Sequence, residues 1–376
     1  MRITIIANAQ ISYKSMGGSD KIFIEMAKSW KDMGHTLAIL GCCEAGAMCE
    51  RSGLAKEFIT LSRFDVEKIG LFFAYSLRTL FSLRGKIVKE GVLYSSSDFF
   101  PDLIFAFWQK LLNSKIKWIA GLFLVAPNPF KIKSARSVRG IIYWISQSIA
   151  VKLIAWKADF VAVLCQEDKV YLRIKGVTLD KIIIISGGVD LDMVNAIPEQ
   201  ERKYAACFVG RFHQQKGIPE LIKIWSNVVK EDSSAKLAIV GWGDEKWVGL
   251  IKDMISQNKL RNNIDLLGYL DNVDKYKILK SSKVFLFPSF YESWGIVIAE
   301  AFSCGCPVVA FDIPATSKFK DGIITVELGK TELFANKVIE LLKDQQLHAQ
   351  YSAQARESSL AFSWKQSAKL LISGVA

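Results

Sequence analysis

The stretch VFLFPSFYESWGIVIAEAFSCGCPVVAF, residues 284–311, decides the fold of this 376-residue chain. Its opening apolar run predicts a buried parallel strand, GIVIAEAF predicts the helix that follows, and CPVVAF predicts the next strand. The first amides of that helix, near residues 295–297, should therefore face the carboxyl edge of a sheet, where free amides and the helix dipole attract phosphate. Glu292 precedes the helix and Glu300 lies more than a turn inside it, where it can reach a ribose hydroxyl beside the phosphate.

Two glutamates beside a helix start also fit a solvated helix face and its preceding loop, which is the commoner use of such a pair. Signals at neighbouring turns favour the binding interpretation. GRFHQQKG follows a predicted strand and places Arg211 and Lys216 where they can neutralise a diphosphate. The Arg211 guanidinium offers a planar fork of donors, and the Lys216 ammonium offers a point charge. Read alone, an Arg and a Lys on a loop are more often simply solvated. LLGYLDN follows another strand, so Tyr269 and Leu270 can present backbone groups to a nucleotide base.

Strand and helix patterns alternate along the chain and restart once, which predicts two parallel sheets covered by helices. The first domain is predicted over residues 1–198 and the second over 199–360, with the boundary in a polar segment near residues 195–203. The tail, 361–376, is predicted to be a helix that crosses back to the first domain. The fold class is therefore α/β, with two Rossmann-like doubly wound domains.

Composition limits the class of protein and its compartment. The chain is 51% hydrophobic and 23% charged, which is typical of a folded protein. Its seven cysteines are never spaced as CxxC, so neither a zinc site nor a disulfide framework is indicated and a reducing cytoplasm is expected. MRITIIANA resembles a first strand more than a signal peptide. The sequence predicts no oligomeric state.

Most of the net charge of +12 comes from one segment. Residues 66–157 contain 14 Lys and Arg against four acidic residues, among many Phe, Trp, Ile and Leu. Basic and apolar residues together predict contact with an anionic membrane surface, although ordinary core helices with cations on their wet side fit as well. An uninterrupted apolar span is absent from the sequence, so we expect a protein that lies on the bilayer without crossing it. Nucleic acid is not an expected partner, because no recognition motif is present.

The turn motifs GRFHQQKG, IVGWGD and LLGYLDN, and the pair Glu292 and Glu300 followed by AFSCGCPVVAF, closely resemble the GT4 family of retaining glycosyltransferases in order and spacing. IVGWGD carries little weight by itself, because Lys246 replaces the third glycine of a dinucleotide loop. The resemblance is strong over residues 200–316 and weaker over 1–195, where GGSDKIFIEMAKSWKDMGHTLAIL and IISGGVD are similar to family segments. It implies the GT-B fold, in which the two Rossmann-like domains face each other across a cleft.

The resemblance also implies roles for individual residues. Arg211 and Lys216 would bind the donor diphosphate, Glu300 the ribose and Glu292 the transferred sugar, so that Glu292, Arg211 and Lys216 are the predicted catalytic residues. The remaining donor-binding residues implied are Gly17, Gly18, Tyr269, Leu270, Trp294, Gly295, Ile296 and Val297. Arg, Lys and helix amides can stabilise a departing diphosphate without metal, so neither a metal nor another cofactor is expected beside the nucleotide-sugar co-substrate. The DxD motif that ends at Asp192 is interpreted as chance.

One departure from the family concerns a histidine. Family members usually carry an active-site histidine in the region occupied here by WIAGLFLVAPNPF, which has none. His35 is interpreted as a turn residue, His213 as a neighbour of the Arg211 loop and His348 as a surface residue. Asp98 is a candidate acceptor-side group, although an N-cap is its commoner use.

The leading hypothesis is a metal-independent, retaining, hexosyltransferase-like enzyme on the cytoplasmic, inner face of the membrane. It would transfer a sugar from a nucleotide-sugar donor to a lipid-linked or glycan acceptor. The missing histidine keeps two alternatives open. One is a catalytically silent sugar-nucleotide-binding or scaffold subunit, and the other is a different GT-B enzyme such as a sugar-nucleotide epimerase.

Overall fold

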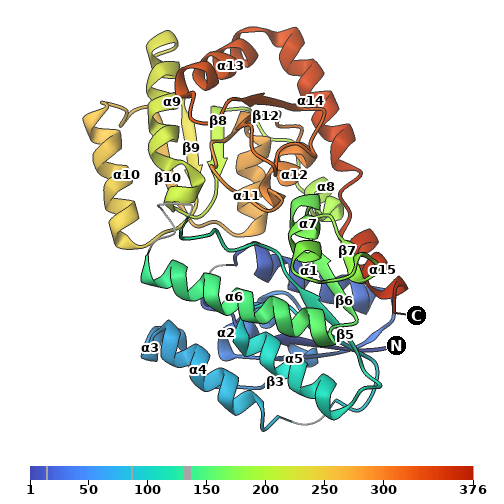
Figure 1. Cartoon of the computed structure of the whole chain (residues 1–376). Helices are drawn as coiled ribbons and strands as arrows, with labels where there is room; N and C mark the ends of the chain where they lie inside the picture. The colour runs from blue at the N-terminus through green and yellow to red at the C-terminus, as the bar shows by residue number, and fades with distance from the viewer. Residues whose placement is uncertain (14–15, 86–87, 131–136, 376) are drawn as a thin grey trace. The chain divides into compact units, whose positions relative to one another are not determined.

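The computed structural model describes residues 1–13, 16–85, 88–130 and 137–375, and the chain forms two compact units. The first unit consists of Met1–Ser186 and Trp364–Ala376, and the second of Gly187–Ser363. Each unit is built on one parallel sheet with helices packed against it (Figure 1). This confirms the predicted α/β class with two Rossmann-like, doubly wound units.

The sheet of the first unit has seven strands in the order β3-β2-β1-β4-β5-β6-β7. Strand β1 lies in its interior, and Ile3, Ile5 and Ile6 are fully buried, as expected for a parallel strand covered on both faces. The strand order reverses between β1 and β4, which creates a crevice at their carboxyl ends. The strands are β1 (Arg2–Ala7), β2 (Thr36–Gly41), β3 (Phe58–Thr60), β4 (Val92–Ser95), β5 (Lys117–Gly121), β6 (Phe160–Val163) and β7 (Ile182–Ile184).

The first unit's helices include three neighbours, α4, α5 and α6, that pack side by side in sequence order. The C-terminal helix α15 belongs to this unit, where the Trp30 indole of α1 donates a 2.9 Å hydrogen bond to the Ala368 carbonyl of α15. The helices are α1 (Gly18–Asp32), α2 (Cys43–Arg51), α3 (Val66–Ile69), α4 (Leu71–Ser82), α5 (Phe100–Leu112), α6 (Val138–Lys157), α7 (Gln166–Ile174) and α15 (Trp364–Ser373), with 3-10 turns at Ala55–Glu57 and Leu179–Lys181.

The sheet of the second unit has six strands in the order β10-β9-β8-β11-β12-β13, so its order reverses between β8 and β11. The strands are β8 (Tyr204–Val209), β9 (Leu237–Val240), β10 (Ile264–Gly268), β11 (Ser282–Phe287), β12 (Val308–Phe311) and β13 (Ile323–Val326). The helices are α8 (Leu191–Ala196), α9 (Ile218–Glu231), α10 (Glu245–Gln257), α11 (Asn272–Lys280), α12 (Ile296–Ser303), α13 (Thr331–Lys343) and α14 (Gln345–Ser359), with a 3-10 turn, η4, at Gln214–Lys216.

The division between the units falls earlier than the predicted boundary at residues 195–203, because the polar segment before β8 packs with the second sheet. The backbone amide of Val189 donates to the Phe362 carbonyl at 3.1 Å, and the Lys280 ammonium donates to the Ile197 carbonyl at 2.6 Å. A Cβ on Gly187 would lie 2.6 Å from the Trp294 ring. These contacts attach residues 187–198 to the second unit.

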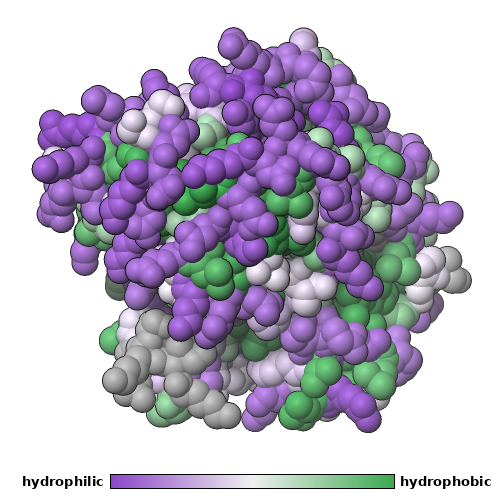
Figure 2. Space-filling view, turned by 90° about the horizontal axis from the view of Figure 1, so that it is seen from above, coloured by the Kyte–Doolittle hydropathy of each residue, from purple (hydrophilic) through white to green (hydrophobic). Residues whose placement is uncertain are grey.

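Helix α6 is unusual in its exposed apolar surface. Over the part of the chain that the structure describes, it is the one helix long and apolar enough to cross a membrane, a test that core helices of soluble proteins also pass. Only 22% of its most apolar window is buried inside the structure. By contrast, the face of the molecule shown in Figure 2 is mainly hydrophilic, with smaller apolar areas between the polar residues. The apolar surface of α6 therefore needs an explanation beyond core packing.

Candidate functional site

The candidate donor site lies at the carboxyl edge of the second sheet, where the loops after β8 and β11 meet at the strand-order reversal. The two loops are tied together, because the Phe290 amide donates to the Gln215 carbonyl at 2.9 Å and the Gln215 side chain donates to the Tyr291 carbonyl at 2.6 Å. Gly217 has φ of +66°, and a Cβ there would lie 1.9 Å from the Pro288 carbonyl oxygen. Only glycine permits this close approach of the loops.

The structure brings Lys216 and Glu292 into direct contact. The Lys216 ammonium forms an ion pair with Glu292 Oε1, and their side chains are 20% and 13% exposed. Arg211 is exposed on the same loop. Burial, followed by the charges of Arg211 and Lys216, lowers the pKa of the neighbouring His213, whose Nδ1 accepts a hydrogen bond from the Gln215 amide. The loop therefore carries two cations and a neutral imidazole beside a carboxylate.

The N-terminus of α12 adds a second positive element. Gly295 occupies its N-cap with φ of +82°, and no side chain in the described chain caps the helix. Ile296 and Val297 are half-buried in its first turn. Uncapped amides at the positive end of a helix dipole bind anions. This geometry can receive the phosphate predicted from the sequence.

Glu300 is buried one turn further along α12 and is 3% exposed. Its Oε1 accepts a 2.8 Å hydrogen bond from the ammonium of Lys275, which also donates to Asn272 Oδ1 at 3.1 Å. Lys275 lies in α11 and fixes the orientation of the carboxylate. The sequence reasoning missed this lysine, although its place one turn into the helix after the Tyr269 loop was a usable signal.

Backbone hydrogen bonds connect the loops that follow β8, β9 and β10. The Gly210 amide donates to the Val240 carbonyl at 3.0 Å, and the Gly241 amide donates to the Gly268 carbonyl at 2.8 Å. The next residues on the third loop are Tyr269, 47% exposed, and Leu270, which is half-buried. Both therefore stand at the same sheet edge as Arg211 and Lys216.

Trp294 occupies a different environment from its predicted neighbours. The side chain is 3% exposed, and its ring meets Phe319 and Phe362 edge-on at centroid distances of 5.2 and 5.1 Å. The Lys318 ammonium lies 5.5 Å from the ring centroid. The indole is thus part of the aromatic core that supports the Glu292 loop. Of Trp294, only the backbone remains available for the predicted contact with the donor.

Gly17 and Gly18 lie at the start of α1 in the first unit. The Gly17 amide donates to the Asp20 carboxylate at 2.7 Å, which caps the helix from within. A Cβ on Gly18 would have no heavy atom within 4 Å among the residues described. The space beside Gly18 is therefore open, whereas the Gly17 amide already donates its hydrogen bond to Asp20.

Asp98 lies just past β4, at the strand-order reversal of the first sheet. It does not cap α5, whose N-cap residue is Phe99; instead its Oδ2 accepts a 2.8 Å hydrogen bond from Gln147 Nε2 of α6. Gln147 also binds the loop after β5, donating to the Leu124 carbonyl and accepting from the Ala126 amide. Burial raises the pKa of Asp98 to about 6. In this way a glutamine organises the segment in which the family histidine is missing.

Asp102 is a second buried carboxyl at the same crevice that the sequence reasoning did not single out. It accepts hydrogen bonds from the Asn8 amide at 2.5 Å and from the hydroxyls of Ser96 and Ser97 at 3.0 and 2.6 Å. Burial raises its pKa to about 7 despite these donors. The side chain therefore joins the loop after β1 to the loop after β4.

We expect the stability of the first unit to fall as the pH rises from about 4, the ordinary Asp value, to the folded-state pKa of Asp102 at about 7. In this window the folded state binds a proton that the unfolded chain has released, so each rise in pH favours unfolding, and the effect ends above the folded pKa. Asp102→Asn should flatten the profile. Hydrogen exchange of β1 and β4 amides between pH 4 and 8 measures it, and an unchanged slope in the variant would contradict the assignment.

Asp190, the first carboxylate of the DxD motif, has a structural use. Its Oδ1 accepts a 2.9 Å hydrogen bond from the Met193 amide and caps α8. A capping role explains this aspartate without any ligand.

Comparisons with known proteins identify what the chain is similar to. Residues 192–358 match the family model for glycosyl transferases group 1. A poly(glycerol-phosphate) alpha-glucosyltransferase of Bacillus subtilis is 36% identical over 157 residues, 41% of this chain and 23% of that protein. A phosphatidyl-myo-inositol mannosyltransferase of Mycobacterium leprae is 30% identical over 190 residues, 48% of this chain and 49% of that protein. The matched stretches thus span less than half of each relative.

Solved structures resemble the whole chain. Anabaena HepE in complex with UDP and glucose superposes with a TM-score of 0.75 at 16% identity, covering 100% of this chain and 99% of that one. Staphylococcus aureus TarM superposes with a TM-score of 0.77 at 16% identity, covering 99% of both chains. These likenesses confirm the GT-B fold class. Over residues 192–358, this chain is similar to the group 1 glycosyl transferases.

Proposed function

We propose that the chain is a metal-independent, retaining glycosyltransferase that transfers a hexose or related sugar from a nucleotide-sugar donor to a lipid-linked or glycan acceptor. One observation carries the proposal. The ion pairs Lys216–Glu292 and Lys275–Glu300 flank the uncapped N-terminus of α12 at the strand-order reversal of the second sheet. Anion-binding amides, a cation and two positioned carboxylates are what a sugar diphosphate requires.

In this proposal each group has a defined task during transfer. Arg211, Lys216 and the amides of α12 stabilise the charge that develops on the leaving diphosphate. Glu300, held by Lys275, accepts hydrogen bonds from the ribose. Glu292 binds the transferred sugar, and the acceptor loses its proton to the leaving phosphate on the same face, so no protein nucleophile is assigned. Because the Lys216 ammonium pairs with Glu292, it contacts both this carboxylate and the diphosphate when the donor is bound.

A donor panel tests the activity. The purified chain is incubated with membrane extract and single nucleotide sugars, beginning with UDP-glucose because a HepE structure contains it, and nucleoside diphosphate release is measured. We expect release with one donor that depends on the acceptor extract. Binding without turnover would favour the catalytically silent subunit. The absence of a histidine from the sequence of the loop after β5 supports that alternative. Interconversion of the donor without acceptor would favour the epimerase.

We further propose that the first unit lies peripherally on the inner, cytoplasmic face of an anionic membrane. Adjacent helices α4, α5 and α6 expose large apolar side chains: Phe72, Phe73, Leu80, Phe81, Trp108, Leu111, Leu112, Val138, Ile141, Ile142, Ile145, Ile149 and Trp156. Bilayer insertion of such residues is favourable by burial of apolar area.

The cationic part of this surface is smaller than the sequence suggested. Arg78 is fully buried in an ion pair, and the Lys110 ammonium binds Asp159 at 2.8 Å with only 11% of its side chain exposed. Lys86, Lys131, Lys133 and Arg136 lie outside the described residues. Arg78 and Lys110 therefore do not contribute to the proposed membrane contact.

Vesicle co-sedimentation tests the membrane proposal. Phe73 and Ile145 are 72% and 47% exposed, so replacing both with Ser removes apolar area without opening the core. We expect binding to vesicles containing phosphatidylserine to weaken about a hundredfold, since each of the two buried apolar side chains contributes about 1.5 kcal/mol, or about tenfold. The control Val273→Ser/Leu333→Ser removes exposed apolar residues from the second unit and should bind normally. Equal loss in both variants contradicts the assigned surface.

A further inference from the structure

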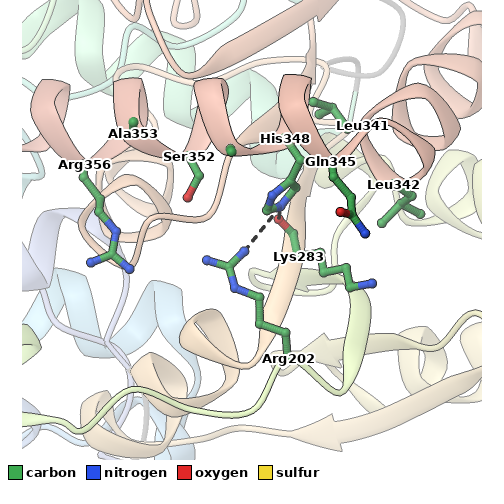
Figure 3. A pocket seen from close by; sticks show the side chains of 10 residues that line it. Arg202, Lys283, Leu341, Leu342, Gln345, His348, Ser352, Ala353 and Arg356 are labelled. Carbon is green, nitrogen blue, oxygen red and sulfur yellow. Dashed lines mark hydrogen bonds between the residues drawn. The ribbon is translucent and has the colours of Figure 1, made fainter.

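A pocket with several cationic side chains lies at the opposite, amino edge of the second unit's sheet (Figure 3). Its volume is about 570 Å³. Arg202 precedes β8 and Lys283 lies at the start of β11, whereas most of the other lining residues come from α14. The candidate donor site follows the carboxyl ends of the same two strands. The pocket is therefore separate from that site.

The pocket has a strong excess of positive charge and basic groups. Among its ten lining residues are Arg202, Lys283, His348 and Arg356, and none of the ten is a carboxylate. Glu199 forms an ion pair with Arg356 at 3.4 Å, and its side chain is 64% exposed. An exposed pair of this kind contributes little to holding the arginine in place.

Two guanidinium groups converge on Gly305. Arg202 Nη2 donates to the Gly305 carbonyl at 3.2 Å, and the Ser352 hydroxyl donates to the same oxygen at 2.6 Å. A Cβ on Gly305 would lie 2.3 Å from Arg356 Nε, so this guanidinium lies directly against the glycine Cα. Figure 3 shows Arg356, Ser352 and His348 extending from successive turns of α14 toward Arg202. Like charges held this close are stabilised by an anion between them.

His348 leaves hydrogen-bond donors of Arg202 available. Its Nε2 is 2.9 Å from the Lys283 carbonyl oxygen and 3.3 Å from Arg202 Nη1. One ring nitrogen cannot donate to the carbonyl and accept from the arginine in the same tautomer. In the part of the chain that the structure describes, the Lys283 ammonium makes no hydrogen bond or ion pair. The pocket thus contains cationic donors without enough acceptors.

We propose that this pocket binds the phosphate group of a small phosphorylated metabolite. Guanidinium forks from Arg202 and Arg356 match phosphate oxygens, and the Lys283 ammonium adds a point charge. The wall formed by Leu341, Leu342 and Ala349 lies beside these groups and receives the carbon part of the ligand. Such a ligand would bind without competing for the donor site.

Calorimetric titration of the full chain at constant ionic strength tests the proposal, with inorganic phosphate in one arm and phenyl phosphate in the other. Saturable binding should weaken about a hundredfold or more in Arg202→Gln/Arg356→Gln, because each of the two charge-assisted contacts contributes about tenfold. Lys223→Gln/Lys252→Gln removes the same charge from exposed positions on α9 and α10 and should change affinity less than about twofold. Phenyl phosphate should bind more tightly than inorganic phosphate.

Two further variants keep the result interpretable. Among the described residues, Lys283→Gln removes no side-chain hydrogen bond or ion pair, so the variant should fold normally and weaker phosphate binding would report the lost charge. Arg211→Gln disables the donor loop and should leave this binding intact, which distinguishes the pocket from the proposed function. Equal affinity in the pocket and control variants, or loss of all binding in Arg211→Gln, overturns the proposal. Equal affinity for the two phosphates contradicts the role of the leucine wall.

Discussion

Glu292→Gln should reduce turnover about 100-fold or more while nucleoside diphosphate binding persists or tightens. Under the proposed function, the carboxylate stabilises positive charge that develops on the sugar during transfer, and loss of one such electrostatic contact typically costs this much. The same change removes the ion pair to Lys216, which frees the ammonium for the diphosphate. Turnover should therefore fall without any loss of diphosphate affinity, a pattern that misfolding does not produce.

The matched control is Glu340→Gln, which removes a glutamate from an exposed Lys337–Glu340 pair of 2.7 Å on α13. Exposed pairs contribute little, so this variant should keep normal turnover and affinity. The measurements are single-donor release kinetics and calorimetric titration with the diphosphate. If Glu292→Gln retains turnover within about fivefold of the unmodified chain, Glu292 has no electrostatic role in transfer.

The second unit could be predicted closely because its signals are local. A buried apolar run followed by a glycine and an apolar helix specifies both β11 and the start of α12, and the structure places Glu292 and Glu300 on either side of that start. The partners of these carboxylates could not be predicted in the same way. Lys275 reaches Glu300 from another helix and lies 25 positions away in the sequence. Contacts between residues this far apart depend on how the helices pack, which a local pattern does not show.

Side-chain environment was the harder part to predict. His348 was interpreted as a surface residue, yet it lines the proposed phosphate-binding pocket together with Arg202, a residue 146 positions away. Trp294 stood among apparent ligand-binding residues, yet Phe319 and Phe362 bury it. A sequence pattern shows which residues share a strand or helix, whereas burial depends on which elements pack together.

Arg78 gives the clearest case, because its replacement should destabilise the first unit by about 3 to 5 kcal/mol. The sequence placed it in a basic segment, but both Arg78 and Glu44 are fully buried, with Nη2 donating to Oε1 at 2.6 Å. The guanidinium also donates to the carbonyls of Phe64, Asn8 and Gln10. It thereby connects α4 to α2 and to the loop that follows β1.

Arg78→Met should be far more harmful than its change in volume implies, since it leaves the Glu44 carboxylate buried beside unpaired carbonyls. Adding Glu44→Gln removes the stranded charge, so the double variant should recover part of the loss. Lys343→Met breaks an exposed pair with Glu231 of 3.2 Å and should cost less than about 1 kcal/mol. Two units need not unfold together, so hydrogen exchange of α2 and α4 amides is the measurement of choice. Similar protection in the Arg78 and Lys343 variants would show that the buried network contributes little, whereas recovery in the double variant would identify the stranded carboxylate as the cause.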